Sequence, residues 1–334
     1  MISMGWFASF LYSQLFVKLP SPTTDFSGQT VIVTGSNTGL GLEAARHLSR
    51  LNASLIILAV RNKTKGEAAK KTILASTGRS DTSIEVWDLD MQSYDSIKSF
   101  CAKANGLSRL DGVIENAGIG TQYFKLVGGF ESTITTNVIG TFLLAFGLLP
   151  KLRKSATEYK TQTKLSIVAS DLHFIAKFPE RHGKDVFASL NDEKKADMSM
   201  ERYAVSKLLQ VLIVRELGSR LAQESTSTLS GVIVNCITPG ACKSDFDRES
   251  TGVGKFIKGI MEALLARTTE AGSRTLLAGV AAGQESQGSY MANCHVAQPG
   301  PMVIGPDGKA LQKEIWQQLV RQLEIIQPGI SQNV

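Results

Sequence analysis

A tyrosine and a lysine four residues apart, Tyr203 and Lys207 in the segment YAVSK, are the residues best suited to carry chemistry in this sequence. Residues four apart on a helix share one face, so the phenol and the ammonium can point to the same site. A free phenol has a pKa of about 10 and is a poor base at neutral pH. A nearby lysine ammonium favours the phenolate and makes proton transfer practical. We therefore expect Tyr203 to act as acid and base.

A glycine-rich turn, TGSNTGLG at residues 34–41, follows the apolar run at residues 30–35 and opens an amphipathic helix at about residue 40. Glycines let the backbone turn tightly and approach a pyrophosphate, and the helix N-terminus supplies amide donors and a positive dipole. This turn predicts a dinucleotide phosphate site. Its expected cofactor-binding residues are Gly35, Asn37, Thr38, Gly39, Leu40 and Gly41.

Short apolar runs alternate with helix-length segments along the chain. The runs are residues 30–35, 54–60, 84–89, 112–118, 165–170 and 231–237. They are continuous, which is typical of strands buried on both faces. Strands separated by helices indicate right-handed crossovers and a parallel sheet. The pattern predicts an α/β fold of Rossmann type, a doubly wound parallel sheet in a three-layer αβα single domain.

The TGxxxGxG turn and the YxxxK pair, in this order, resemble the short-chain dehydrogenase/reductase family over about residues 27–295. The long interval between Ser170 and Tyr203 is similar to the retinol-dehydrogenase-like branch, and the chain looks similar to fungal members of that branch, many of which tailor secondary metabolites. The resemblance implies an oxidoreductase that transfers a hydride between a nicotinamide cofactor and a carbonyl or alcohol carbon.

The resemblance also implies roles for single residues. Ser170, at the end of the fifth run, would donate a hydrogen bond to the substrate oxygen. Lys207 would hold the cofactor ribose, and with an oxidised nicotinamide it would lower the pKa of Tyr203. Asn137 lies in an otherwise apolar helical segment and needs partners there. It would hold a water that links the Lys207 ammonium to solvent. For His173, orientation or loop packing is favoured over a direct role.

The second run ends in Ala59-Val60-Arg61-Asn62, where many NAD-binding folds carry an acidic residue for the ribose diol. A guanidinium at this point can bind a 2′-phosphate through two hydrogen bonds. We therefore predict NADP(H), with Arg61 and Lys65 at the phosphate. A solvated arginine at a strand end is the alternative.

Further cofactor contacts are implied by matches at other strand ends. Asn116-Ala117-Gly118 looks like the family's NNAG turn, with Glu115 in place of the first asparagine. Ser244 stands where the family usually has a threonine against the nicotinamide carboxamide. In chain order the remaining expected cofactor residues are Asp88, Leu89, Asn116, Ala117, Gly118, Pro239, Gly240 and Ser244.

We expect an N-terminal apolar extension over residues 1–26, the short-chain dehydrogenase/reductase Rossmann domain over residues 27–295, and a C-terminal extension over residues 296–334. Residues 174–202 and 241–267 leave carboxyl ends of strands, where open α/β sheets bind ligands. We interpret both as substrate-pocket walls and the second as a lid. Both segments favour a bulky apolar carbonyl or alcohol as substrate, such as a retinoid-like, steroid-like, terpenoid or polyketide compound. The apolar side chains in them are Phe174, Phe178, Phe187, Phe246, Phe256, Ile257 and Met261.

Residues 5–17 (GWFASFLYSQLFV) form an apolar and aromatic run that is too short to span a bilayer. No basic leader or small-residue cleavage site accompanies it. Two interpretations stay open. One is a helix packed on the domain or beside the substrate pocket. The other is peripheral membrane contact, with Trp6, Phe7, Phe10 and Phe16 in the membrane interface.

Composition excludes several other classes. The net charge of +6 comes from basic residues interleaved with acidic ones, so no nucleic-acid partner is expected. Four distant cysteines and four scattered histidines show neither disulfide nor metal spacing, so we expect no metal and a cytoplasmic location. We expect a monomer or homodimer.

Two rival functions stay open at this point. One is a nucleotide-sensing binding protein on the same fold, since fold does not prove function. The retention of Asn137, Ser170, Tyr203 and Lys207 together argues against it. The other is an epimerase or dehydratase of the extended branch, which usually shows a GxxGxxG turn that this chain lacks.

Overall fold

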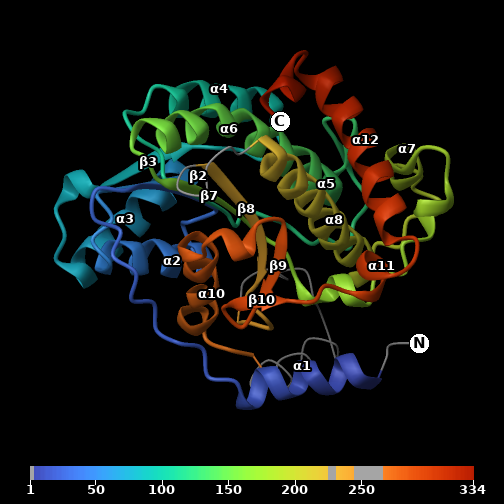
Figure 1. The fold of residues 1–334 in the computed structure, drawn as a ribbon, viewed down its shortest axis with the longest axis horizontal. Helices are drawn as coiled ribbons and strands as arrows, with labels where there is room; N and C mark the ends of the chain where they lie inside the picture. The colour runs from blue at the N-terminus through green and yellow to red at the C-terminus, as the bar shows by residue number, and fades with distance from the viewer. Residues whose placement is uncertain (1–3, 225–230, 244–265) are drawn as a thin grey trace.

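The middle layer of the computed structural model, which describes residues 4–224, 231–243 and 266–334, is a twisted sheet (Figure 1). Its strand order is β10-β9-β8-β7-β4-β1-β2-β3, and all neighbours are parallel except β10 and β9. The strands are β1 (Thr30–Thr34), β2 (Leu55–Val60), β3 (Ile84–Asp88), β4 (Gly112–Glu115), β7 (Gln162–Val168), β8 (Gly231–Thr238), β9 (Ser289–Ala292) and β10 (His295–Ala297). The predicted doubly wound parallel sheet is confirmed, with an antiparallel edge strand added.

Alternate side chains of each strand enter two separate cores. In β1, Ile32 belongs to one hydrophobic cluster, whereas Val31 and Val33 belong to the other. In β2, Ile57 and Ile56 are divided in the same way. Because both faces of the central strands are covered, most of their positions are apolar, which explains why these strands read as continuous runs.

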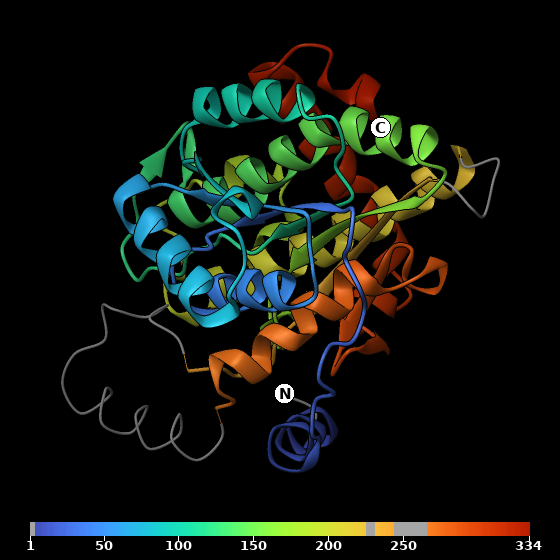
Figure 2. The same cartoon turned by 90° about the vertical axis from the view of Figure 1, so that its left-hand side faces the viewer.

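Helices cover both faces of the sheet (Figures 1 and 2). One face is covered by α2 (Gly39–Arg50), α3 (Lys63–Thr77) and α10 (Thr269–Ala281). The other face is covered by α4 (Tyr94–Asn105), α6 (Thr141–Glu158), α8 (Met200–Glu224) and α12 (Gly308–Ile326). The predicted three-layer arrangement is therefore present.

Helix α6 follows a short helix, α5 (Ser132–Ile134), and a π-helical turn, η2 (Thr135–Gly140). The stretch Ser132–Glu158 is long and apolar enough to cross a membrane, the one such helix among the described residues, but its apolar 18-residue window is entirely buried inside the protein. It is a core helix, not a span.

The residues after position 295 complete the same core. Strand β10 crosses the expected boundary between domain and C-terminal extension. Beyond it, α11 (Pro301–Ile304), α12 and η6 (Ile330–Asn333) pack on the face that carries α8. Ile315, Trp316 and Leu319 are buried there among residues of α6 and α8. The C-terminal segment is thus part of the folded unit.

The expected substrate-pocket walls are described to different extents. Residues 174–202 contain short helices, η4 (Pro179–His182) and α7 (Val186–Leu190). Phe178 and Phe187 are fully buried in the hydrophobic core, whereas Phe174 is partly exposed. Most of the expected lid, and with it Phe246, Phe256, Ile257 and Met261, lies outside the described residues.

The N-terminal run forms a helix, α1 (Met4–Phe16), as one of the two interpretations predicts. It lies at the lower edge of the molecule, below β10 and α10 (Figure 1), and Figure 2 shows it end-on outside the three layers. A strand-free segment joins it to β1. Two further short strands, β5 (Leu126–Val127) and β6 (Phe130–Glu131), form a separate hairpin.

Candidate active site

The glycine-rich turn lies at the carboxyl end of β1. Gly35 and Gly39 have φ angles of +65° and +59°, which disfavour any side chain. A Cβ on Gly41 would lie 2.6 Å from the carbonyl oxygen of Gly35, so only glycine lets turn and helix pack this closely. A Cβ on Gly39 would meet no atom of the described residues within 4 Å, so the outer side of the turn is open to them. A pyrophosphate fits this close but open backbone.

The N-terminus of α2 carries no competing group. Thr38 is the N-cap residue, and its side chain makes no capping hydrogen bond. The first turn holds no acidic residue, so its amides and the helix dipole are left for an anion. Asn37 is partly exposed beside them. Leu40 instead points to α10, where a Cβ on Gly272 would lie 2.9 Å from it.

Two cations follow β2. Arg61 is the first residue after the strand, and Asn62 caps α3 by accepting a hydrogen bond of 2.9 Å from the Lys65 amide. The side chains of Arg61 and Lys65 are both exposed. The strand end is held beside the glycine turn, since the Gly35 amide donates to the Ala59 carbonyl at 2.9 Å. A 2′-phosphate at this point would meet two exposed cations.

Asn116 ties the end of β4 to the glycine turn. Its side-chain nitrogen donates to the carbonyl oxygens of Thr34 at 3.0 Å and Gly35 at 3.3 Å. The Ala117 amide donates to the Thr34 hydroxyl at 2.9 Å. One residue on, a Cβ at Gly118 would lie 3.1 Å from the Asn137 side-chain oxygen. Residues 116–118 therefore connect the glycine turn, where a pyrophosphate would bind, with Asn137.

Strand β3 ends at the same edge of the sheet, where the carboxyl ends of the parallel strands lie. Asp88 is its last residue and is exposed. The Leu89 amide donates to the Val60 carbonyl at 3.0 Å, which holds the ends of β3 and β2 together. Leu89 itself is buried. The glycine turn follows β1 and Asp88 ends β3, with β2 between them. An adenosine bound across these strand ends would extend towards Asp88.

Glu115 is a buried carboxyl without a partner. Only 3% of it is exposed, and among the described residues neither carboxylate oxygen has a hydrogen-bond partner. Burial raises the pKa of Glu115 well above its usual range. Burial thus favours the neutral form of this carboxyl, which an asparagine in its place would share.

Ser170, Tyr203 and Lys207 meet where β7 ends and α8 begins. Ser170 is the N-cap residue of η3 (Asp171–Phe174), and its hydroxyl accepts a hydrogen bond of 3.2 Å from the Leu172 amide. The same side chain is hydrogen-bonded to the Tyr203 phenol. The Lys207 ammonium lies 5.4 Å from the centroid of the Tyr203 ring. The helical spacing thus places phenol, hydroxyl and ammonium in one site.

Burial, more than charge, sets the titration of this site. It raises the pKa of Tyr203, and the hydrogen bond from Ser170 opposes the rise. It lowers the pKa of Lys207 to about 7, and the neighbouring Cys236 opposes that fall. Desolvation of both groups favours their neutral forms. Burial thus brings the pKa of Lys207 close to neutral pH in the protein alone.

Asn137 lies in the π-helical turn, a feature often found at functional sites. Its side-chain nitrogen donates to the Ile119 carbonyl at 2.8 Å and to the Ser206 hydroxyl at 3.0 Å. Its side-chain oxygen accepts the Ile119 amide at 2.9 Å. These bonds fix the Gly118 turn against α8. A role of Asn137 in holding a relay water stays a prediction.

Gln210 is a polar residue of this site that the sequence analysis missed. It is 1% exposed and contacts both Lys207 and Asn137. The signal was present: a lone glutamine in the apolar run LLQVL at residues 208–212 needs buried partners, as Asn137 does.

A model of the short chain dehydrogenase family matches residues 29–158. A short chain dehydrogenase/reductase of a Cryptosporiopsis species is 43% identical over 97% of this chain and 99% of its own length. A short-chain dehydrogenase of Penicillium roqueforti is 44% identical over 97% of this chain and 84% of its own length. The chain belongs to the short-chain dehydrogenase family.

Solved structures share the fold of this short-chain dehydrogenase. An Escherichia coli oxidoreductase has a TM-score of 0.56 at 22% identity, covering 81% of this chain and 98% of its own. A Shigella flexneri short chain dehydrogenase complexed with NADP has a TM-score of 0.55 at 21% identity, covering 81% of this chain and 99% of its own. At such identities the likeness is one of fold.

In the dehydrogenase, Asp171 and His173 join the short helix η3, next to Ser170, to neighbouring segments by hydrogen bonds. Asp171 accepts hydrogen bonds from the Tyr290 phenol at 2.7 Å and the Thr238 hydroxyl at 3.1 Å. The Gly300 amide donates to Nε2 of His173 at 2.9 Å, so Nδ1 carries the proton toward the Ser170 carbonyl at 2.7 Å. Burial lowers the pKa of His173 to about 4. Both ring nitrogens are used, which supports orientation as its role.

Helix α1 docks at the carboxyl end of β8. The Arg267 guanidinium donates to the Ser13 carbonyl and to Asn293, each at 2.8 Å. Trp6 stacks on Phe174, with ring centroids 5.7 Å apart. The interpretation of a helix packed beside the substrate pocket is therefore the one that this packing favours.

Pro239 and Gly240 lie under this helix. The Pro239 carbonyl accepts a hydrogen bond from Arg267 at 3.4 Å. Gly240 has a φ of +75°, and a Cβ there would lie 2.4 Å from the Gln14 side chain of α1. Ser244, expected at the nicotinamide, lies outside the described residues.

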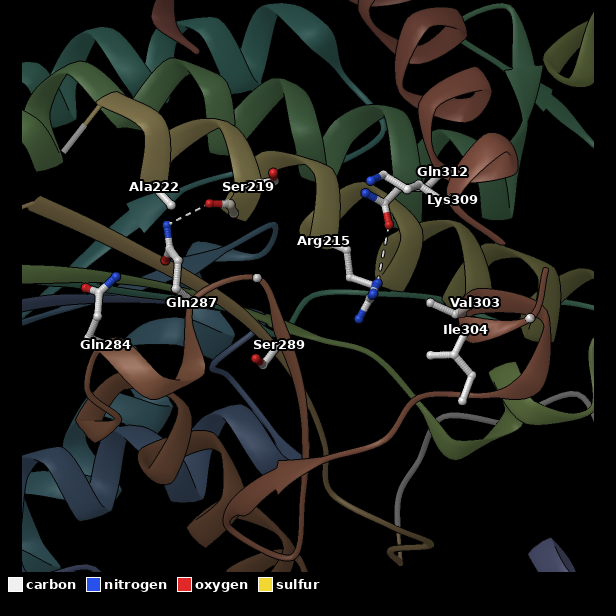
Figure 3. A pocket seen from close by; sticks show the side chains of 13 residues that line it. Arg215, Ser219, Ala222, Gln284, Gln287, Ser289, Val303, Ile304, Lys309 and Gln312 are labelled. Atoms are coloured by element: carbon white, nitrogen blue, oxygen red, sulfur yellow. Dashed lines mark hydrogen bonds between the residues drawn. The ribbon is translucent and has the colours of Figure 1, made fainter. Parts of the chain in front are cut away.

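A separate hollow of about 620 Å³ lies between α8, α11 and α12 (Figure 3). Arg215 and Gln312 line it and are joined by a hydrogen bond of 3.3 Å. Ser289, the first residue of β9, also lines it. The hollow is thus at the amino end of a strand, whereas open α/β sheets bind their ligands at the carboxyl ends. We assign the chemistry to the carboxyl edge.

Proposed function

We propose that this short-chain dehydrogenase is an NADP(H)-dependent oxidoreductase that interconverts a carbonyl and an alcohol on a bulky apolar molecule. The observation that carries the proposal is the meeting of Ser170, Tyr203 and Lys207 at the strand edge that also holds the glycine turn. Binding alone would not require a phenol that shares a hydrogen bond with a serine and faces an ammonium.

Several observations support NADP(H) as the cofactor. The exposed cations Arg61 and Lys65 follow β2, and residues 59–65 contain no acidic side chain. The open glycine turn and the uncapped N-terminus of α2 suit the pyrophosphate. The Shigella flexneri structure of the same fold was solved with NADP.

NADPH, when bound, supplies the hydride. Ser170 then donates a hydrogen bond to the carbonyl oxygen of the substrate and orients it. Tyr203 gives its phenolic proton to that oxygen as negative charge develops there, the task of a general acid. The ammonium of Lys207 stabilises the phenolate that remains and contacts the ribose. In alcohol oxidation the phenolate accepts the proton, and the roles are exchanged.

The surroundings of Ser170 support an apolar substrate. Phe174 follows it by four residues and is covered by Trp6 of α1, so aromatic side chains flank the approach to the catalytic serine. The fungal origin of the similar dehydrogenases is in keeping with a polyketide, a terpenoid or another secondary metabolite as substrate. Comparing metabolites with and without the active enzyme by mass spectrometry would identify it.

The decisive experiment is Tyr203→Phe, which removes only the phenolic hydroxyl. We expect turnover of phenanthrenequinone, a bulky apolar diketone, to fall by at least about 100-fold because the general acid is lost. The dissociation constant for NADPH, measured by nicotinamide fluorescence, should change by less than about threefold.

Tyr94→Phe serves as the matched control for that experiment. It removes a phenol that donates to the Gly128 carbonyl at 2.9 Å and is hydrogen-bonded to the Thr135 side chain, outside the set Ser170, Tyr203 and Lys207, and it should leave turnover unchanged. Full activity in Tyr203→Phe would contradict the proposed chemistry.

We also propose that the outer face of α1 rests on a lipid surface on the cytoplasmic side. The helix carries no charge, and Tyr12, Leu15 and Phe16 are 62%, 52% and 72% exposed. Exposed apolar side chains that gather on one face of a helix can be buried at the boundary between lipid headgroups and acyl chains. Lys18 follows it, where an anionic headgroup would bind. Four free cysteines support a reducing compartment.

A further inference from the structure

Gln210 occupies the space directly behind the catalytic lysine. It lies one turn after Lys207 on α8 and is almost completely buried. Its side-chain oxygen accepts a hydrogen bond of 3.0 Å from the Lys207 ammonium. Its side-chain nitrogen donates a bond of 2.6 Å to the main-chain carbonyl of Asn137.

The orientation of this amide follows from its two partners. An ammonium can only donate, so the oxygen of Gln210 must face Lys207. A carbonyl can only accept, so the nitrogen must face Asn137. The side chain therefore forms a fixed bridge between α8 and the π-helical turn η2.

The bridge determines where the ammonium points. Lys207 also donates to the Val168 carbonyl at the end of β7, at 2.7 Å. With Gln210 this takes two of its three N–H groups and holds the nitrogen below the Tyr203 ring. The third N–H is left for the phenol and the ribose. Without Gln210, one of the two anchors of the ammonium would be lost.

We propose that Gln210 is a positioning residue of this reaction: it holds the Lys207 ammonium in place and connects it to the Asn137 carbonyl without a water. The inference rests on the proposed function. A primary amide neither gains nor loses a proton at neutral pH, so this bridge positions Lys207 but passes no proton to Asn137.

The alternative role is a purely structural one, a buried amide that joins two helices. The two roles differ in their effect on the titration of Lys207. The groups that face its ammonium are Tyr203 on α8 and Cys236 on β8, together with the carbonyl of Val168. Removing the Gln210 oxygen lowers the pKa of Lys207, whereas a carboxylate in its place raises it. A structural role predicts no such opposite shifts.

The test compares Gln210→Leu with Gln210→Glu. NADPH affinity is measured by nicotinamide fluorescence between about pH 6 and pH 9, a range that brackets the titration of Lys207, whose pKa burial lowers to about 7. We expect the step in affinity to move down by about one pH unit in the leucine variant and up in the glutamate variant. Turnover of phenanthrenequinone by Gln210→Leu should fall about tenfold to 100-fold.

Gln318→Leu is the matched control, because Gln318 is a buried glutamine of α12 that bonds the Val186 amide at 2.7 Å, away from the site. It should lower the melting temperature and leave the pH dependence unchanged. The proposal is overturned if the pH at which NADPH affinity changes is the same in both Gln210 variants as in the wild type. It is also overturned if this pH moves in the same direction in both variants. If the leucine variant does not fold, the glutamate variant alone decides.

Failure of the proposed function would look different. In that case Tyr203→Phe would keep its turnover, while the pH dependence of NADPH binding would still report on Lys207 and Gln210. The Gln210 proposal alone would be overturned if Tyr203→Phe lost its turnover but the pH dependence of NADPH affinity stayed unshifted in both Gln210 variants.

Discussion

Tyr203 and Lys207 show how burial competes with charge at a single pair of residues. The sequence predicts that the ammonium lowers the pKa of the phenol. In the structure burial is the largest influence, and it raises the pKa of Tyr203 while it lowers that of Lys207. The hydrogen bond from Ser170 acts in the predicted direction but is the smaller cause. The burial of a residue depends on what packs over it, which spacing along one helix does not reveal.

Arg61 is the residue on which the choice of cofactor depends. We predict that Arg61→Asp weakens NADPH binding about 10-fold to 100-fold, because a carboxylate replaces a guanidinium at the 2′-phosphate. NADH binding should change far less, since NADH has no phosphate there. Fluorescence titration with each cofactor measures both constants. Lys71→Asp makes a comparable charge change further along α3, where the side chain is also exposed, and is the control. An unaltered preference would remove Arg61 from the site.

Helix α1 is the element whose placement the sequence left open. Its contacts join residues far apart in the chain, such as Ser13 with Arg267, 254 positions apart. No local pattern encodes such a contact. The apolar character of residues 5–17 is nevertheless in keeping with both faces of the helix. One face packs on the domain through Trp6 and Phe174, and the other exposes apolar side chains.

We predict that replacing Tyr12, Leu15 and Phe16 together by serine weakens binding to lipid vesicles at least about tenfold, since each loses apolar area that the bilayer would bury. Co-sedimentation with phosphatidylcholine vesicles, with and without phosphatidylserine, measures this. The fold should be retained because all three side chains are exposed. Ile325→Ser changes a 75% exposed apolar residue of α12 and should have no effect. Equal sedimentation of all variants would exclude a lipid contact of α1.

For the molecule as a whole, Glu115 links stability to pH. Its folded pKa lies above the ordinary value of 4.5, so the folded chain binds more protons than the unfolded chain above that pH. The free energy of unfolding must therefore fall as pH rises from about 4.5 towards the folded pKa. This contribution opposes folding at neutral pH.

We predict that Glu115→Gln, which cannot titrate, removes this slope and raises the free energy of unfolding at pH 8 by at least about 1 kcal/mol. Urea unfolding at a series of pH values measures it. Glu67→Gln, at an exposed position of α3, should leave the slope as it is. Parallel curves for the wild type and Glu115→Gln would show that the carboxyl does not carry the dependence.

The sequence by itself determined the parallel sheet, the six apolar runs that form strands in it, the glycine turn and the phenol–ammonium pair. All of these are local: apolar runs, glycines and a helical spacing are set by neighbours in the chain. Tertiary structure alone decided that Gln210 bridges Lys207 and Asn137, that Asn116 binds the glycine turn, and that residues 296–334 complete the core. Those contacts form between segments far apart in sequence, and they exist only once the sheet has brought its carboxyl ends to one edge.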